Sequence, residues 1–190
     1  MFAIAITLLV LEIQLPEGAF DHLWRALADA WPSYLAYVTS FLTVGGVWLA
    51  HHRLFSHLRF IDPHLMRLNI VLLMLAAFLP FPTGLLAEAF DASREAERAA
   101  VVIYGVTAGL IEMILGAAWR YAATQPSLLD GAAPPPRAAL ERHGFPAIVY
   151  GVGIVLAVLL FPRLGAVLYL VVAARAVLIP AGTLRLTLGH

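Results

Sequence analysis

Long apolar runs separated by short polar segments are the dominant pattern along this chain. Six runs can be delimited, at about residues 1–15, 33–55, 65–87, 99–122, 145–161 and 164–179. A helix needs roughly 20 predominantly apolar residues to cross a bilayer, with about 17 as the lower limit. The pattern therefore predicts an all-α integral membrane protein with six transmembrane helices in one domain, residues 1–190, whose first helix is short.

The first run carries a second, finer pattern. Four of its large apolar residues fall within roughly 60° of one another on a helix of about 100° per residue: Ile4, Leu8, Leu11 and Leu15. Thr7 borders this stripe on one side and Glu12 on the other. Lipid imposes no such stripe, so we expect this face to make an ordered contact, with another helix or as the wall of a symmetric pore.

Composition supports the membrane interpretation. Hydrophobic residues make up 62% of the chain, charged residues 13%, and the mean hydropathy is +0.87. A soluble domain is closer to half apolar and a quarter charged. The net charge of zero argues against a nucleic-acid partner, and the absence of cysteine excludes disulfides and thiolate metal sites.

The arginines predict the orientation of the chain in the membrane. If the loops after the second and fourth runs and the end of the sixth lie inside, eight arginines are inside and four outside. Positive charge gathers on the cytoplasmic side of membrane proteins. We therefore expect a multi-pass protein of a cell membrane with both termini in the cytoplasm.

Prolines and glycines indicate where these helices bend and pack. Pro80 and Pro82 should bend the third run or end it early. Small residues let helices approach closely in lipid. The candidates for such packing are Gly45, Gly46, Gly105, Gly109, Gly151 and Gly153.

A group of histidines stands at the end of the second run. His51, His52 and His57 follow the pattern H-H-x-x-x-x-H, with Arg53 next to the first pair. A metal site needs three or four convergent ligands. Adjacent histidines point about 100° apart on a helix, and the sequence has no second cluster. We favour a polar network at the inner interface, bonded to neighbouring helices, and assign no metal and no cofactor. Its members are Trp48, His51, His52, Arg53 and Asn69.

Glu112 is an acidic residue in the middle of the fourth run. A carboxylate in hydrocarbon is costly and is a candidate functional group. It could relay protons, or pair with a polar residue of a neighbouring helix such as Asn69 or a histidine; we favour the pairing. Glu12, in contrast, lies near the end of its run, where it could draw cations toward a pore mouth.

Three segments resemble the transmembrane protein 175 family of potassium channels. They are FAIAITLLVLEI near the start of the chain, VGGVWLAHHRLF at residues 44–55, and RLNIVLLMLAAFLPFPTGLLAE at residues 67–88. The middle segment is similar to the W-x-x-H-H segment of the family, with Trp48 at the tryptophan position. The resemblance covers about the first 90 residues and the six-span count.

The resemblance implies a cation channel in which the first helix of each subunit lines the pore. Carried over by position, large apolar residues form the constriction at Ile4, Leu8 and Leu11, and Thr7 occupies a position linked to selectivity. No T-V-G-Y-G segment is present for a carbonyl filter. Members with one six-span set per chain are homotetramers, so we expect a homotetramer that passes potassium and other monovalent cations with modest selectivity.

The chain departs from the family at its first residues. The family carries R-x-x-x-F-S-D just before the first of these segments, and Met1 stands where that motif would end. In the family this motif resembles an anchor against a polar patch, which here would include His51, His52 and Asn69. Without the anchor these groups are expected to lack partners, at about 1–3 kcal/mol per buried group. Either the start lies upstream or this member is altered.

Three other functions stay open. The first is a proton-coupled transporter or proton path that uses Glu112 and the histidines. The second is a membrane metalloenzyme, and the third is a structural membrane protein without transport. No nucleophile triad, phosphate loop or dinucleotide-binding motif is recognisable, so we expect no enzymatic activity.

Overall fold

The computed structural model describes residues 1–15, 18–90, 92–129, 148–156, 159 and 162–178. Within these ranges the regular elements are all helical. The main helices are α1 (Phe2–Leu9), α2 (Leu23–Asp29), α3 (Trp31–Ser56), α4 (Pro63–Phe78), α5 (Pro80–Ala89), α6 (Arg94–Thr124) and α8 (Pro162–Leu178), together with a helix at residues 148–156. Short 3-10 turns are η1 (Val10–Glu12), η2 (Ala19–His22) and η3 (Pro126–Leu128).

Among the described residues, three helical stretches are long and apolar enough to cross a membrane: Trp31–Ser56, Pro63–Ala89 and Arg94–Thr124. The prediction of an all-α membrane protein is thereby confirmed. These stretches coincide with the second, third and fourth apolar runs, and α8 coincides with the sixth. The helix at residues 148–156 lies inside the fifth run, whose remaining residues fall largely outside the described part of the chain.

The third run is broken where its prolines predicted. α4 ends at Phe78, Leu79 forms a turn, and α5 begins at Pro80. Proline lacks the backbone N–H that would bond the preceding turn, and its ring crowds the carbonyl four residues earlier. The break lets α5 change direction and pack against both α3 and α6.

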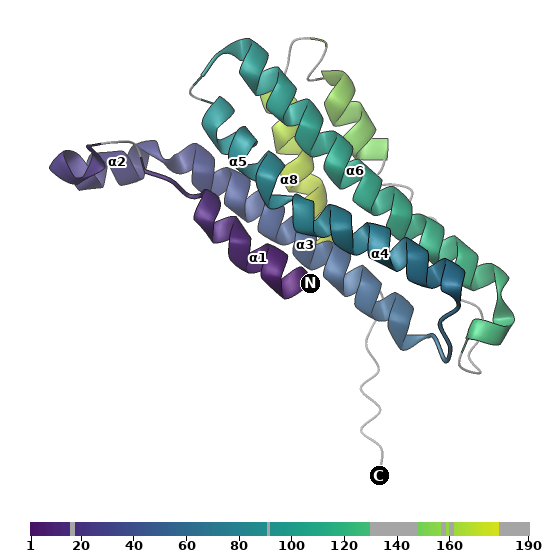
Figure 1. The fold of residues 1–190 in the computed structure, drawn as a ribbon. Helices are drawn as coiled ribbons and strands as arrows, with labels where there is room; N and C mark the ends of the chain where they lie inside the picture. The colour runs from purple at the N-terminus through teal and green to yellow at the C-terminus, as the bar shows by residue number, and fades with distance from the viewer. Residues whose placement is uncertain (16–17, 91, 130–147, 157–158, 160–161, 179–190) are drawn as a thin grey trace.

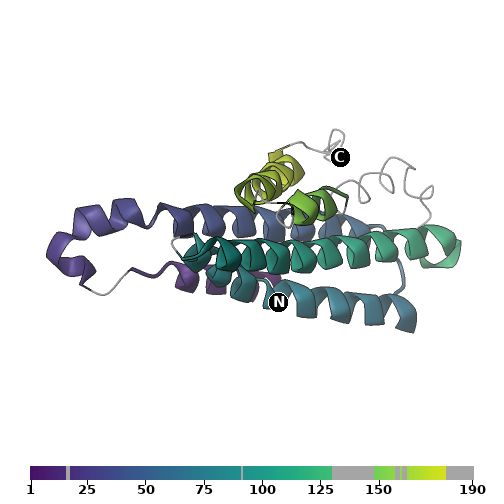
Figure 2. The same ribbon diagram turned by 90° about the horizontal axis from the view of Figure 1, so that it is seen from above.

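The helices form a bundle around α3 and α6 (Figures 1 and 2). α3 packs on α8 and α5, α6 packs on α4 and α5, and α1 lies against α3 and α4. An ion pair joins α8 to α6, with Arg163 Nε 2.9 Å from Oε1 of the buried Glu97. One short helix, α1, therefore lies at the edge of the bundle, while the three long helices carry the core.

Glycines permit the closest helix contacts. A Cβ at Gly105 or Gly153 would overlap the ring of the buried Tyr169, and one at Gly46 would lie 2.8 Å from Cβ of Ala176. Gly109 is in ordinary contact with Tyr150. The packing role is confirmed for these four glycines. Within the described part of the subunit, the Cβ positions of Gly45 and Gly151 have no neighbour within 4 Å, so these two glycines make no such contact there.

Candidate pore-lining surface

α1 presents a large apolar surface that the described part of its own subunit leaves exposed. Phe2, Ala5 and Leu9 are buried against the bundle. The three helical residues of the predicted stripe lie on the opposite side, with exposed fractions of 58% for Ile4, 41% for Leu8 and 65% for Leu11. These three residues define what we call the α1 stripe. The sequence thus identified a set of large apolar side chains that point together out of the subunit.

Thr7 is exposed next to the α1 stripe. Its hydroxyl donates to the backbone carbonyl of Ile4 at 2.9 Å. Because the proton is used inside the helix, the free lone pairs of Oγ1 point away from it as acceptors. Such an oxygen can replace part of the hydration shell of a cation.

The helix is shorter than the apolar run that predicted it. The α-helical part ends at Leu9, the 3-10 turn η1 continues to Glu12, and Ile13 is extended. Leu15 precedes a proline, and a residue in that position disfavours the α conformation. Leu15 is exposed but does not continue the α1 stripe on the helix, which is a correction to the four-residue stripe.

Glu12 packs against the first turns of α5. A Cβ at Gly84 would overlap the Glu12 carboxylate and lie 3.2 Å from its Cδ, so the glycine makes room for this side chain. Glu88, one turn further along α5, acts on it as a second negative charge. Two carboxylates therefore lie near the end of α1 where η1 closes the helix.

The polar patch predicted for Trp48, His51, His52, Arg53 and Asn69 divides into separate groups. His51 Nε2 and Asn69 Oδ1 are 2.8 Å apart, and Phe2 meets the His51 ring edge-on at 5.2 Å. The expectation that these two groups lack partners was wrong, because they bond to each other and join α3 to α4 under the start of α1. His52 instead stacks on Trp48, with both side chains exposed.

The other member of the patch, Arg53, contributes its backbone. Its carbonyl accepts from Ser56 Oγ at 2.8 Å and lies 2.6 Å from His57 Nδ1. In the described part of the chain no group of three or more His, Cys, Asp or Glu side chains is placed to hold a metal ion. The histidines are thus spread over several structural contacts.

A buried hydroxyl cluster escaped the sequence analysis. Ser40 Oγ lies 2.7 Å from Thr83 Oγ1 and 3.1 Å from the hydroxyl of Tyr104, which is 3.3 Å from Thr43 Oγ1. The cluster joins α3, α5 and α6 by hydrogen bonds of the kind that hold helices together in lipid. The spacing of Ser40 and Thr43 on one face of α3 was the available signal.

Glu112 is buried in α6, and its charge acts on Tyr150.

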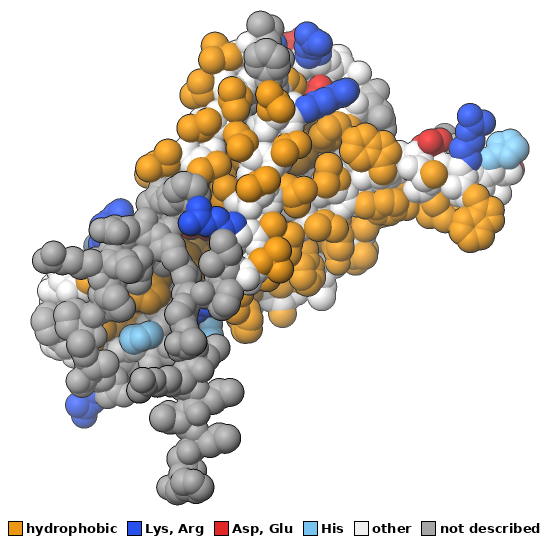
Figure 3. Space-filling model, turned by 180° about the vertical axis from the view of Figure 1, so that it is seen from behind, with side chains coloured by type: hydrophobic (Ala, Val, Ile, Leu, Met, Phe, Trp, Pro, Cys, Tyr) orange, Lys and Arg blue, Asp and Glu red, His pale blue; other side chains and the backbone are white. Residues whose placement is uncertain are grey.

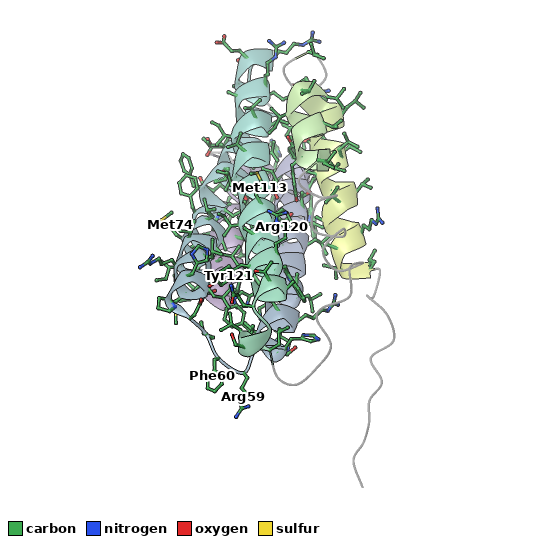
Figure 4. The ribbon with its side chains drawn as sticks, turned by 90° about the vertical axis from the view of Figure 1, so that its right-hand side faces the viewer. Arg59, Phe60, Met74, Met113, Arg120 and Tyr121 are labelled. Carbon is green, nitrogen blue, oxygen red and sulfur yellow. The ribbon has the colours of Figure 1, made fainter. Side chains whose placement is uncertain are left out.

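At the end of the bundle where α3 ends and α4 begins, Asp62 is the N-cap residue of α4. Its Oδ1 accepts from the backbone N–H of Leu65 at 2.8 Å, and its Oδ2 accepts from the hydroxyl of Tyr121 on α6. Figure 4 shows Tyr121 on the side of α6 that faces α4. Two hydrogen bonds lower the pKa of Asp62 below its ordinary value of 3.8. The one from the Tyr121 hydroxyl has the larger effect, and the one from the Leu65 N–H has the smaller. The ionised form is therefore favoured by folding.

This lowered pKa predicts how stability depends on pH. A carboxylate whose folded pKa is depressed stabilises the fold above its unfolded pKa and loses that effect as pH falls through the folded value. Asp62→Asn keeps an N-cap acceptor but removes the charge. We expect the wild type to melt at a higher temperature than Asp62→Asn at neutral pH, and the difference to vanish below the folded pKa of Asp62. Melting of both proteins in detergent from neutral pH down to about pH 2 tests this.

Asp62→Ala is the matched comparison, since it removes the cap as well. It should melt below Asp62→Asn at every pH. A melting difference between wild type and Asp62→Asn that is independent of pH would show that the carboxylate charge is not involved.

Comparisons with known proteins point to one family. The family model described as "Endosomal/lysosomal potassium channel TMEM175" matches residues 1–80. A potassium channel of Streptomyces collinus is 39% identical over 146 residues, which cover 76% of this chain and 70% of that protein. A potassium channel of Chamaesiphon minutus is 41% identical over 151 residues, covering 78% and 70%.

A solved structure gives the same result for the fold. The crystal structure of a lysosomal potassium-selective channel TMEM175 homolog from Chamaesiphon minutus superposes with a TM-score of 0.82 and 35% sequence identity. The superposition covers 93% of this chain and 90% of that one. The similarity thus extends well beyond the first 90 residues that carry the recognisable motifs.

Proposed function

Because the chain belongs to the TMEM175 family of potassium channels, we propose that it forms a potassium-permeable channel in a cell membrane. Four copies would surround a central pore lined by α1. The observation that carries this proposal is the α1 stripe. Ile4, Leu8 and Leu11 are large and apolar, they share one face of a helix, and their own subunit leaves them exposed.

Exposure alone would suit lipid as well as a pore, so the division of α1 into two faces matters. A helix at the edge of a bundle needs no ordered row of branched side chains toward lipid. A four-fold axis next to α1 brings four copies of Ile4 together, with Leu8 and Leu11 about one and two turns further along. Thr7 then lies beside the constriction, with an acceptor oxygen available to a passing cation.

Such a constriction would work by excluding water. When four apolar side chains close on the axis, the narrow space between them dewets and ions cannot pass. When the helices move apart, a partly dehydrated ion can cross. Sodium holds its water more tightly than potassium, so the dehydration step favours potassium, and we expect modest selectivity.

The charges near the pore fit this arrangement. Glu12 and Glu88 place two carboxylates close to the end of α1, where they would raise the local concentration of cations at one mouth. The Asp62 end would lie in the cytoplasm, following the distribution of arginines. Both chain termini would then be cytoplasmic.

A proton pathway is the second candidate function. The buried Glu112, near Tyr150, and the hydroxyl cluster of Ser40, Thr43, Thr83 and Tyr104 put groups that can exchange protons inside the bundle. Intramembrane acids are frequent members of proton relays. The same groups also explain helix packing, and for that reason we rank this candidate below the channel.

Potassium flux from liposomes containing the purified chain tests the proposal. Passive efflux down a potassium gradient at equal pH on both sides, together with a four-subunit mass in mild detergent, would support the channel. Flux that appears only with an opposing proton gradient would support the proton-coupled alternative. A monomer without flux would contradict both the assembly and the pore.

A further inference from the structure

The segment between α1 and α3 leaves the bundle as a projecting arm. The arm consists of η2 and α2, residues 19–29, and among the described elements it packs mainly on α3. Figures 1 and 2 show it extending past the end of the bundle. Its two aromatic residues are almost fully exposed, Phe20 at 86% and Trp24 at 87%. Exposed apolar surfaces of this kind commonly mark sites that bind another protein or a membrane.

The arm has two chemically different sides. Within α2, Trp24 and Leu27 fall about 60° apart on a helix of about 100° per residue, whereas Arg25 and Asp29 fall at least about 100° from both. The charged residues are Asp21, Arg25 and Asp29. Figure 3 shows the same separation, with apolar side chains along one side of the arm and charged ones along the other. The apolar side of the arm can therefore bury surface against a partner, while the charged side remains hydrated.

A neighbouring tryptophan shows what a contact within the subunit looks like. Trp31, at the start of α3, meets the ring of Phe90 edge-on at a centroid distance of 5.9 Å. This contact ties the first turn of α3 to the end of α5. No ring contact of this kind is found for Trp24 or Phe20 within the described residues. Trp31 is thus packed within the subunit, whereas the aromatic side chains of the arm remain exposed.

The position of the arm identifies its partner. Figure 1 shows α1 along one edge of the bundle, with the arm leaving on that same side, away from α4 and α6. In the proposed channel the α1 side faces the other subunits, and lipid surrounds the opposite side. We infer that the aromatic side of the arm docks on the neighbouring copy of this chain, so that four arms link the subunits around one mouth of the pore.

The composition of the arm agrees with this partner. Buried aromatic anchors surrounded by polar and charged residues are typical of protein interfaces. Trp24 would be the anchor, and Asp21, Arg25 and Asp29 would remain hydrated at the rim. Because the arm connects directly to α1 and α3, its docking would fix the spacing of the pore-lining helices at this mouth. The inference rests on the proposed tetramer.

Tryptophan fluorescence tests the docking directly. The chain has four tryptophans, and replacing Trp31, Trp48 and Trp119 with phenylalanine leaves Trp24 as the reporter. In liposomes we expect blue-shifted emission, little quenching by aqueous iodide and little quenching by brominated phosphatidylcholine. Strong quenching by the brominated lipid would instead place the arm in the membrane interface. Strong quenching by iodide would place it in water, and either result would overturn the inference.

A second measurement covers the case in which the triple variant does not fold. The chain has no cysteine, so Trp24→Cys in the otherwise unchanged protein introduces a unique thiol. We expect slow maleimide labelling in the assembled protein and fast labelling once detergent separates the subunits. Equal rates in the two states would contradict docking on another copy. Potassium flux from the same sample shows independently whether the proposed channel itself stands.

Discussion

Ile4→Asn is expected to remove most of the discrimination between potassium and sodium and to admit larger cations. In the proposed pore this change places four amide side chains where four branched apolar ones met. An amide holds water, so the constriction no longer dewets, and an ion crosses with more of its hydration shell. The potassium-to-sodium permeability ratio should fall toward equality. The ratio is measured from reversal potentials of the reconstituted protein under mixed-ion gradients.

Val10→Asn is the matched control for this prediction. Val10 is also a β-branched residue of the first helical segment and is exposed, but it lies about 120° around the helix from Ile4. The same chemical change there should leave the permeability ratio near that of the wild type. An Ile4→Asn protein with unchanged conductance and selectivity would remove Ile4 from the pore.

Gly153→Val is expected to destabilise the bundle strongly. A Cβ at Gly153 would lie 2.9 Å from Cζ of Tyr169 and closer still to another atom of its ring. The ring cannot swing away easily, because Tyr169 is fully buried and is stacked near Tyr104 and Tyr150. Forcing extra volume into a packed core typically costs about 1–3 kcal/mol, and valine adds two further methyl groups. Thermal melting of the purified protein, followed by gel filtration, measures the loss.

Gly151→Val separates this packing effect from the change in helix propensity. Gly151 belongs to the same helix, but its Cβ position has no neighbour within 4 Å. Both substitutions change backbone freedom in the same way, so the difference between their melting temperatures reports the contact with Tyr169. Equal melting temperatures for the two variants would show that the helix at residues 148–156 does not pack on Tyr169 as described.

Sequence patterns foresaw the helices because hydrophobicity and length determine what can cross a bilayer. The runs at 33–55, 65–87 and 99–122 overlap α3, the α4–α5 pair and α6, and the break at Pro80 follows from the chemistry of proline. The α1 stripe was also readable. The spacing of Ile4, Leu8 and Leu11 places them on one face of a helix, and the structure leaves these three side chains exposed.

Contacts between distant segments were beyond the reach of those patterns. The hydrogen bond between His51 and Asn69 depends on how α3 and α4 meet, so the sequence suggested unsatisfied groups where the structure has a pair. The hydroxyl cluster around Tyr104 likewise needs three helices in place. The exposure of Phe20 and Trp24 in the arm could not be predicted either, because it depends on which residues the rest of the bundle covers.

The most direct test is silver block of potassium flux through Leu8→Cys. The native chain contains no thiol, so silver added to liposomes reacts only at the introduced cysteine. If the α1 stripe lines the pore, silver should abolish flux through Leu8→Cys and leave flux through Leu9→Cys, whose side chain is buried against the bundle, nearly unchanged. Equal sensitivity of the two variants, or no block of Leu8→Cys, would mean that ions pass elsewhere.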